Sequence, residues 1–117
     1  MKDDRLYLLH IRDAIDRIIA YTTGGKDTFL ADSKTQDAVI RNLEVIGEAV
    51  KNLSDQLKAA YTGVPWRQIA GMRDKMIHKY FGVDLELVWD AVDLDLPALK
   101  SHVELILSVQ ENAPGSR

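Results

Sequence analysis

The sequence predicts an all-α protein, a bundle of four or five helices that forms a single domain. Apolar residues recur at intervals of three and four along most of the chain, which is typical of one buried helix face. No stretch of any length shows the alternation of apolar and polar residues that a half-buried strand requires. The chain has 117 residues, which is enough for one hydrophobic core and leaves little for a second.

The first predicted helix lies near the amino terminus. Its apolar face is formed by residues three and four positions apart, namely Leu8, Ile11, Ile15 and Ile18. The stretch TTGGKD at residues 22–27 should end this helix, because paired glycines weaken a helix and suit its end.

A second and longer helix is predicted to start at Ser33. This serine stands three residues before Gln36, which is the spacing of a capping box. The apolar positions that follow step by four and three residues: Val39, Leu43, Ile46, Val50 and Leu53. Such a seam is typical of a long helix packed nearly antiparallel to a neighbour. Ser54 is then placed to cap a short helical segment.

The remaining helices are delimited by prolines, a glycine and aspartates. Pro65 is placed to open a third helix from Trp66 to about Phe81, ended by Gly82. Asp84 should cap a fourth helix. Since a proline cannot lie inside a straight helix, Pro97 predicts a second start at Asp95. The inward positions of these last two segments are Leu85, Val88, Trp89, Val92, Leu99, Val103 and Ile106. The bundle is predicted to span residues 1–111, with residues 112–117 as a disordered tail.

Composition narrows the function classes. Apolar residues make up 46% of the chain and charged residues 28%, as in ordinary folded proteins. No apolar run approaches the roughly 20 residues that span a bilayer, and the start MKDDRLYLLH lacks the apolar centre of a signal peptide. We therefore expect a cytoplasmic protein with no membrane partner. The absence of cysteine excludes disulfides, thiolate metal sites and a cysteine nucleophile.

The charge is distributed unevenly. The formal net charge of −3 argues against a general nucleic-acid coat, which usually has a basic surface. Residues 65–80 nevertheless carry four basic residues against one acidic residue, whereas residues 84–111 carry seven acidic residues against one lysine. The basic segment could therefore meet a phosphate group.

This basic segment contains the candidate site, in the stretch GMRDKMIHKYFG at residues 71–82. On a continuous helix, Arg73 and Tyr80 share a stripe, and Asp74 and His78 are neighbours four residues apart. Arginine offers a permanent planar charge matched to phosphate, and histidine exchanges protons near neutral pH. Together Arg73 and His78 suffice for metal-free phosphodiester cleavage, because one group moves protons and the other stabilises developing charge.

Each of these residues also has a structural explanation. Arg73 could be solvated surface, His78 a satisfied partly buried histidine, and Tyr80 a core or rim aromatic. Asp74 could either accept a hydrogen bond from His78 or simply face solvent. No metal site is expected, since the three histidines lack metal-ligand spacing. Glu44 and Glu48 could form half of a carboxylate metal site, but they are better explained as a solvated pair.

The sequence also resembles a known family. RNLEVIGEAVKNLS (41–54), VPWRQIAGMRDKMIHKYFGVDLELVW (64–89) and DLPALK (95–100) are similar to the HepT-like family of HEPN-domain toxins. The resemblance covers nearly the whole chain, and Arg73, His78 and Tyr80 fill the family's R-x4-H-x-Y signature. Many members carry a polar residue, often asparagine, at the position of Asp74, so this aspartate adds a negative charge beside the motif.

The resemblance implies a fold, an activity and partners. The fold would be a HEPN-type bundle that forms a symmetric homodimer, with the two motif copies facing each other in a cleft. The activity would be that of a metal-independent ribonuclease toxin without a cofactor of its own, with Arg73 and His78 as catalytic residues and Asp74 as a supporting residue. The partner would be a minimal nucleotidyltransferase antitoxin that uses ATP and Mg²⁺ to transfer AMP to Tyr80.

Two other functions remain open at this stage. The chain could be an adaptor that presents a degraded cleft to a protein partner. It could also be a nucleotide-binding subunit of a nucleotidyltransferase complex without nuclease activity. The intact motif disfavours the adaptor, but the sequence does not separate a nuclease from a nucleotide-binding subunit.

Overall fold

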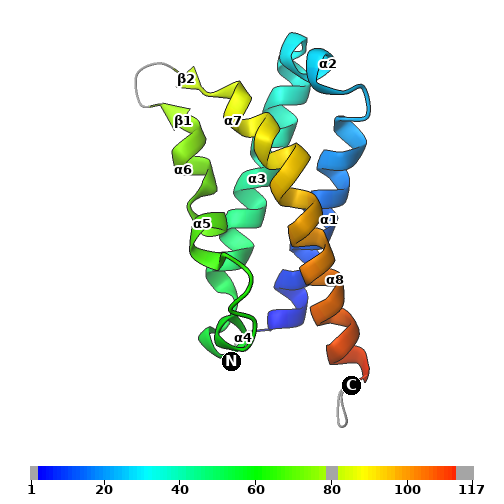
Figure 1. The fold of residues 1–117 in the computed structure, drawn as a ribbon, viewed down its shortest axis with the longest axis vertical. Coiled ribbons are helices and arrows are strands. Elements are labelled where there is room, and N and C mark those ends of the chain that lie inside the picture. Colours follow the sequence, from blue (N-terminus) through cyan, green and yellow to red (C-terminus); the bar gives the residue numbers. More distant parts are fainter. Residues whose placement is uncertain (1–2, 79–81, 113–117) are drawn as a thin grey trace.

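The computed structural model describes residues 3–78 and 82–112. In this part of the chain four helical segments run up, down, up and down along the long axis of the molecule (Figure 1). The first is α1 (Asp4–Tyr21), the second is α3 (Ser33–Asn52), the third comprises α5 (Trp66–Ala70) and α6 (Met72–Met76), and the fourth ends in α8 (Leu96–Asn112). The prediction of an all-α bundle is confirmed.

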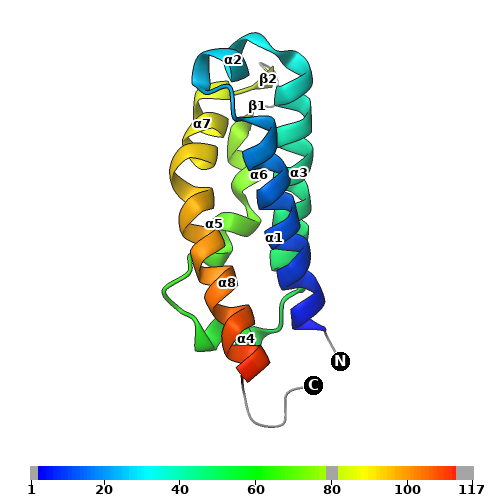
Figure 2. The same ribbon diagram turned by 90° about the vertical axis from the view of Figure 1, so that its right-hand side faces the viewer.

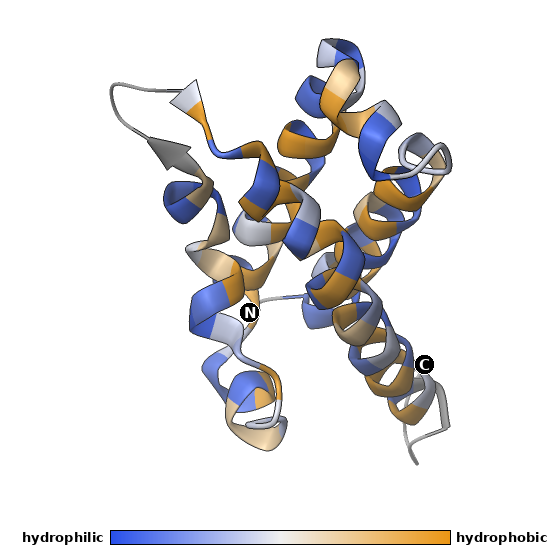
Figure 3. Cartoon of the chain, turned by 45° about the horizontal axis from the view of Figure 1, so that its top comes forward, coloured by the Kyte–Doolittle hydropathy of each residue, from blue (hydrophilic) through white to orange (hydrophobic). Residues whose placement is uncertain are grey.

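The two longest helices, α1 and α3, lie side by side and antiparallel (Figures 1 and 2). The apolar seams predicted for them are correct, because every one of their residues is at most 1% exposed: Leu8, Ile11, Ile15, Ile18, Val39, Leu43, Ile46, Val50 and Leu53. Colouring by hydropathy shows apolar and polar residues alternating around these helices (Figure 3). Burial of these seams is the main source of stability in such a bundle.

The connection between α1 and α3 contains a helix that the sequence analysis did not predict. Helix α1 ends at Tyr21 as expected, and α2 (Lys26–Ala31) follows after Gly25, whose φ of 87° favours glycine. The reason for α2 is burial, since its Phe29 is 1% exposed and its ring centroid lies 5.5 Å from that of Trp89. This short helix therefore covers the end of the bundle between α1 and α3.

The predicted capping box at the start of α3 is wrong. The N-cap is Asp32, whose carboxylate accepts hydrogen bonds from the Lys34 N–H at 3.1 Å and the Thr35 hydroxyl at 2.7 Å. Gln36 donates instead to the carbonyls of Phe29 and Leu30, at 2.9 and 3.1 Å. Ser33 is thus the first residue of the helix rather than its cap, because the preceding carboxylate already accepts the free N–H of Lys34.

The segment after α3 follows the prediction. Ser54 caps α4 (Asp55–Ala60), with its hydroxyl accepting from the Leu57 N–H at 3.1 Å. The same hydroxyl donates to Asp4 at 2.6 Å, which joins this end of the bundle to the start of α1. Pro65 immediately precedes α5, as expected.

The predicted continuous helix from Trp66 to about Phe81 is wrong. Helix α5 ends at Ala70, α6 ends at Met76, and the chain then extends into β1 (Ile77–His78). This strand pairs antiparallel with β2 (Gly82–Val83), with His78 opposite Gly82. The Met76 carbonyl accepts the Asp84 N–H at 2.7 Å, and Gly82 has a φ of 82°. A hairpin therefore replaces the last helical turns, because the returning strand bonds the carbonyl that a helix would use.

The last segment departs from prediction at one point. Asp84 caps α7 (Leu85–Asp90) by accepting from the Leu87 N–H at 3.2 Å, as expected. No new helix begins at Asp95, because a π-helical turn, η1 (Ala91–Asp95), joins α7 directly to α8. The Leu96 N–H bonds the Ala91 carbonyl, five residues back. This wider turn shifts the hydrogen-bond register just before Pro97, so the helix continues past the proline.

The carboxyl end of the bundle lies close to the predicted boundary. Helix α8 reaches Asn112, one residue beyond the predicted end of the bundle, and the rest of the predicted tail lies outside the described residues. None of the helices that the structure describes is both long and apolar enough to cross a membrane.

Candidate active site

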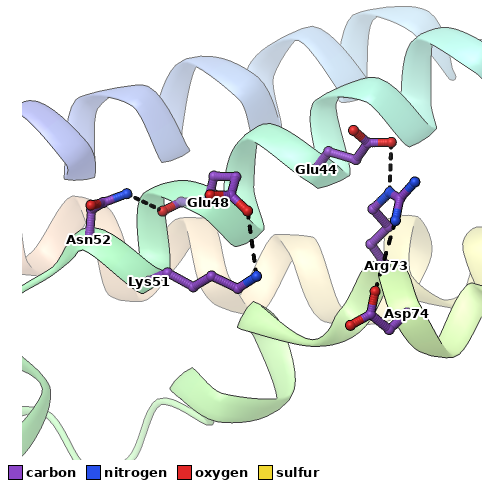
Figure 4. Close-up of polar contacts among 6 residues, drawn as sticks. All are labelled: Glu44, Glu48, Lys51, Asn52, Arg73 and Asp74. Carbon is purple, nitrogen blue, oxygen red and sulfur yellow. Dashed lines mark hydrogen bonds and ion pairs between the residues drawn. The ribbon is translucent and has the colours of Figure 1, made fainter.

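Arg73 is presented on α6, beside the hairpin. Its side chain is 47% exposed, and its Nε lies 2.7 Å from Oε1 of Glu44 on α3 (Figure 4). The hydrogen bond to Glu44, followed by its charge, raises the pKa of Arg73 above its ordinary value. The guanidinium is therefore permanently charged, open to solvent and bonded along one edge.

Asp74 lies beside Arg73 rather than in a helical pair with His78. Its Oδ1 is 3.9 Å from Nη1 of Arg73, and its side chain is 82% exposed. The predicted pairing of Asp74 with His78 required a helix through both residues, and α6 ends at Met76. The helix on which Arg73 and Tyr80 were predicted to share a stripe also ends at Met76, and Tyr80 lies outside the described residues. These corrections concern the geometry of the motif, and the supporting role of Asp74 stays a prediction.

The other two motif residues are only partly described. The backbone of His78 lies in β1, paired with Gly82, while its side chain lies outside the described part of the structure. Tyr80 lies wholly outside the described residues. The roles assigned to His78 and Tyr80 are therefore predictions that rest on the motif.

Glu44 is the residue of this site that sequence reasoning missed. It was interpreted with Glu48 as a solvated pair or as half of a metal site, but the two side chains point to different partners (Figure 4). Glu44 binds Arg73, while Glu48 lies 3.4 Å from Nζ of Lys51. Residues 3–78 and 82–112 contain no group of three or more histidine, aspartate or glutamate side chains that could hold a metal ion.

A sequence signal for the approach of α3 to Arg73 was nevertheless present. Gly47 stands beside Ile46 in the apolar seam, and a Cβ atom built on it would lie 3.2 Å from the Ala70 carbonyl oxygen. A glycine in a buried helix face often marks the close approach of another backbone. Here it lets the junction of α5 and α6 sit against α3, one turn from Glu44.

Two further basic residues of the predicted segment are exposed. Arg67 on α5 and Lys75 on α6 are both exposed, and neither forms an ion pair with any residue that the structure describes. The predicted basic segment is thus confirmed as exposed at Arg67, Arg73 and Lys75. Such a surface favours the approach of a phosphate group.

An apolar groove lies on the opposite side of α6, toward α7 and α8. Its volume is about 530 Å³, and its lining includes Met72, Met76, Leu87 and Leu94. Leu94, on η1, is 65% exposed. The groove lining also includes Lys75, Asp90, Asp95 and His102, but not Arg73.

Comparison with known proteins places this site in a family. The profile of the family described as "Ribonuclease HepT-like" matches residues 11–106. "Probable ribonuclease HepT" of Thermococcus cleftensis is 48% identical over 99 residues, which cover 84% of this chain and 90% of the relative. "Putative RNase TTE0752" of Caldanaerobacter subterraneus is 40% identical over 112 residues, covering 95% of this chain and 100% of the relative.

A third relative is longer than this chain. "Gamma-glutamylcyclotransferase and putative RNase MJ0434" of Methanocaldococcus jannaschii is 46% identical over 107 residues, which cover 91% of this chain. The chain spans about half of that relative, because the match covers 48% of its length. No solved structure matches the chain. From the family profile and these identities, the chain belongs to the Ribonuclease HepT-like family, and ribonuclease is the enzyme class that this membership assigns to it.

Proposed function

We propose that this protein is a metal-independent ribonuclease that acts as the toxin of a toxin–antitoxin pair. The observation that carries the proposal is the exposed Arg73 guanidinium, held 2.7 Å from Glu44 at the start of a family motif. An exposed arginine that uses Nε to bind a carboxylate can offer its terminal nitrogens to a phosphodiester. The relatives named as ribonucleases support RNA as the substrate.

In the proposed reaction the nucleophile is a 2′-hydroxyl of the RNA, and the motif residues catalyse its attack. The 2′-hydroxyl gives its proton to a base and attacks the adjacent phosphorus, and the bond to the 5′-oxygen breaks as that oxygen takes up a proton. The products are a 2′,3′-cyclic phosphate and a 5′-hydroxyl. His78 serves as the proton-transfer group, Arg73 neutralises the charge that develops on the non-bridging oxygens, and Asp74, beside Arg73, is the supporting residue.

A homodimer completes this proposal. A symmetric interface would bring two copies of His78 together, so that one acts as base and the other as acid. The apolar groove with the exposed Leu94 supports an assembly, since such a surface gains from burial. Light scattering should give about twice the chain mass of 13.2 kDa. A monomer at micromolar concentration would contradict the shared site.

The decisive experiment is RNA cleavage in EDTA by the wild type and by Arg73→Ala. We expect the wild type to cleave without metal and Arg73→Ala to lose activity by about 10²-fold or more. Arg17→Ala is the matched control, because it removes an exposed arginine from α1, outside the motif segment, and should leave cleavage nearly unchanged. Cleavage that stops in EDTA, or that survives Arg73→Ala, would refute the proposal. A wild type that cleaves no RNA with or without metal would favour a nucleotide-binding or adaptor subunit instead.

Regulation would act through Tyr80. AMP attached to its hydroxyl adds negative charge and bulk to the motif, which should repel an RNA phosphate. A minimal nucleotidyltransferase with ATP and Mg²⁺ should therefore add AMP-sized masses to the wild type and to Tyr21→Phe, which removes an exposed tyrosine on α1. Intact-mass spectrometry should show no such addition to Tyr80→Phe. Additions retained in that variant would place the acceptor elsewhere.

A further inference from the structure

The ion pair between α3 and α6 points to a specific task for Glu44. We propose that Glu44 is a positioning residue that holds Arg73 in the orientation needed to receive a phosphodiester. This inference rests on the proposed ribonuclease function and names a residue outside the R-x4-H-x-Y motif.

The geometry decides which edge of the guanidinium is free. Arginine has one N–H on Nε and four on its two terminal nitrogens. Glu44 accepts from Nε at 2.7 Å, a distance typical of a charge-assisted hydrogen bond. The contact from Nη1 to Asp74 is 3.9 Å, too long for a hydrogen bond. Among the residues that the structure describes, none forms a hydrogen bond with the terminal nitrogens, which therefore remain available for two oxygens of a phosphate.

The two partners differ in how firmly the fold holds them. Arg73 sits on α6, which has only five residues and continues directly into the hairpin. Glu44 sits near the middle of the 20-residue helix α3, beside the buried Leu43. A five-residue helix has little stability of its own. The long helix thus supplies a fixed point for a side chain whose own element is short.

Glu44 has two opposing effects on a bound phosphate. Its hydrogen bond restricts the long arginine side chain before the substrate arrives, which lowers the entropy lost in the transition state. Its negative charge offsets part of the attraction between Arg73 and the phosphate. Glutamine separates the two effects, because its amide oxygen can accept from Nε while carrying no charge.

The first test is steady-state cleavage of an oligoribonucleotide by Glu44→Ala and Glu44→Gln. We expect Glu44→Ala to lower kcat by about 10-fold or more, since a misplacement on the order of 1 Å can cost 10²-fold. Glu44→Gln should restore most of kcat and lower KM. Glu48→Ala is the matched control, one turn along the same helix and paired with Lys51. A Glu44→Ala variant with unchanged or raised kcat would overturn the inference.

A double mutant tests whether Glu44 acts through Arg73. If it does, Glu44→Ala should lower kcat in the wild type but have little effect in Arg73→Ala, so the two losses are not additive. Full additivity would mean that Glu44 affects cleavage by another route, and would overturn the proposed role.

A spectroscopic readout separates this inference from the proposed function. The Nε–H signal of Arg73, assigned by its loss in Arg73→Ala, should exchange slowly with water in the wild type and in Glu44→Gln, and rapidly in Glu44→Ala. Equal exchange in all three proteins would refute the positioning role even if the wild type cleaves RNA. A protected signal in a protein that cleaves no RNA would instead refute the ribonuclease proposal. The contact between Glu44 and Arg73 would then stand, but its role in cleavage would be refuted.

Discussion

The α1–α3 pair and the segment from Trp66 to Val83 are built in different ways. Helices α1 and α3 have 18 and 20 residues, and the seam between them is fully buried. The later segment divides its residues between two five-residue helices and two two-residue strands. The stable pair carries no motif residue, whereas Arg73 lies on the short elements. The difference indicates that the long helices supply stability and the short segment presents the chemistry.

The two regions nevertheless pack against each other. Gly47 lets the junction of α5 and α6 approach α3, and Glu44 bonds Arg73. Met72 and Met76 are 8% and 6% exposed, so α6 is also anchored in the core. A substitution in the long helices should therefore lower the stability of the whole fold, whereas a substitution in the hairpin should mainly loosen the hairpin itself.

The largest expected effect is in the α1–α3 seam. Ile46→Ala should lower the free energy of unfolding by about 2–5 kcal/mol, because it leaves a cavity at a position with 0% exposure. The control is Leu105→Ala on α8, which removes an exposed leucine and should stay within about 0.5 kcal/mol. Urea denaturation measures both. If the two variants lose equal stability, the seam is not the stabilising region that the comparison identifies.

The same comparison shows what the sequence could and could not predict. The seams of α1 and α3 were predicted correctly because burial itself imposes the spacing of three and four residues. In the third segment, Ile69, Met72 and Met76 keep that spacing across the break at Gly71, so periodicity alone favoured one helix. The bond from the Asp84 N–H to the Met76 carbonyl joins residues eight apart and leaves no periodic signal.

The candidate site, like the fold, was predicted only in part. The motif identified Arg73 without any structure, because the family resemblance rests on residue identity. Glu44 was missed because its partner is 29 positions along the chain, and nothing local distinguishes it from Glu48, which has the same type and lies one turn away. Long-range ion pairs of this kind depend on how helices pack, which the period of a single helix does not reveal.

A substitution in the β1–β2 hairpin should cause an intermediate loss of stability. Gly82→Ala places a side chain at a φ of 82°, which costs roughly 1–2 kcal/mol for other residues. We expect the Asp84 amide, bonded to Met76 at 2.7 Å, to exchange faster with water while the amides in the middle of α3 change less. Gly63→Ala is the control, because a Cβ there meets nothing within 4 Å. Equal loss of protection in α3 would show that the hairpin and the long helices unfold together.

The smallest expected effect is a pH dependence at the start of α3. Hydrogen bonds from the Thr35 hydroxyl and then the Lys34 N–H lower the pKa of Asp32 below its ordinary 3.8. A carboxyl group whose pKa is lower in the folded state favours folding when ionised, so its contribution is fully present above the unfolded pKa. That contribution is lost as the pH falls through the folded pKa.

Asp32→Asn tests this assignment, because asparagine can still cap the helix but does not titrate in this range. We expect the stability advantage of the wild type over Asp32→Asn, measured by urea denaturation, to shrink as the pH falls from about 5 to about 3. Ser33→Ala should show no such change relative to the wild type, since Ser33 is the first helical residue and not the cap. If the stability difference between the wild type and Asp32→Asn does not depend on pH, or if Ser33→Ala loses much stability, then Ser33 is the cap, as the sequence pattern predicted.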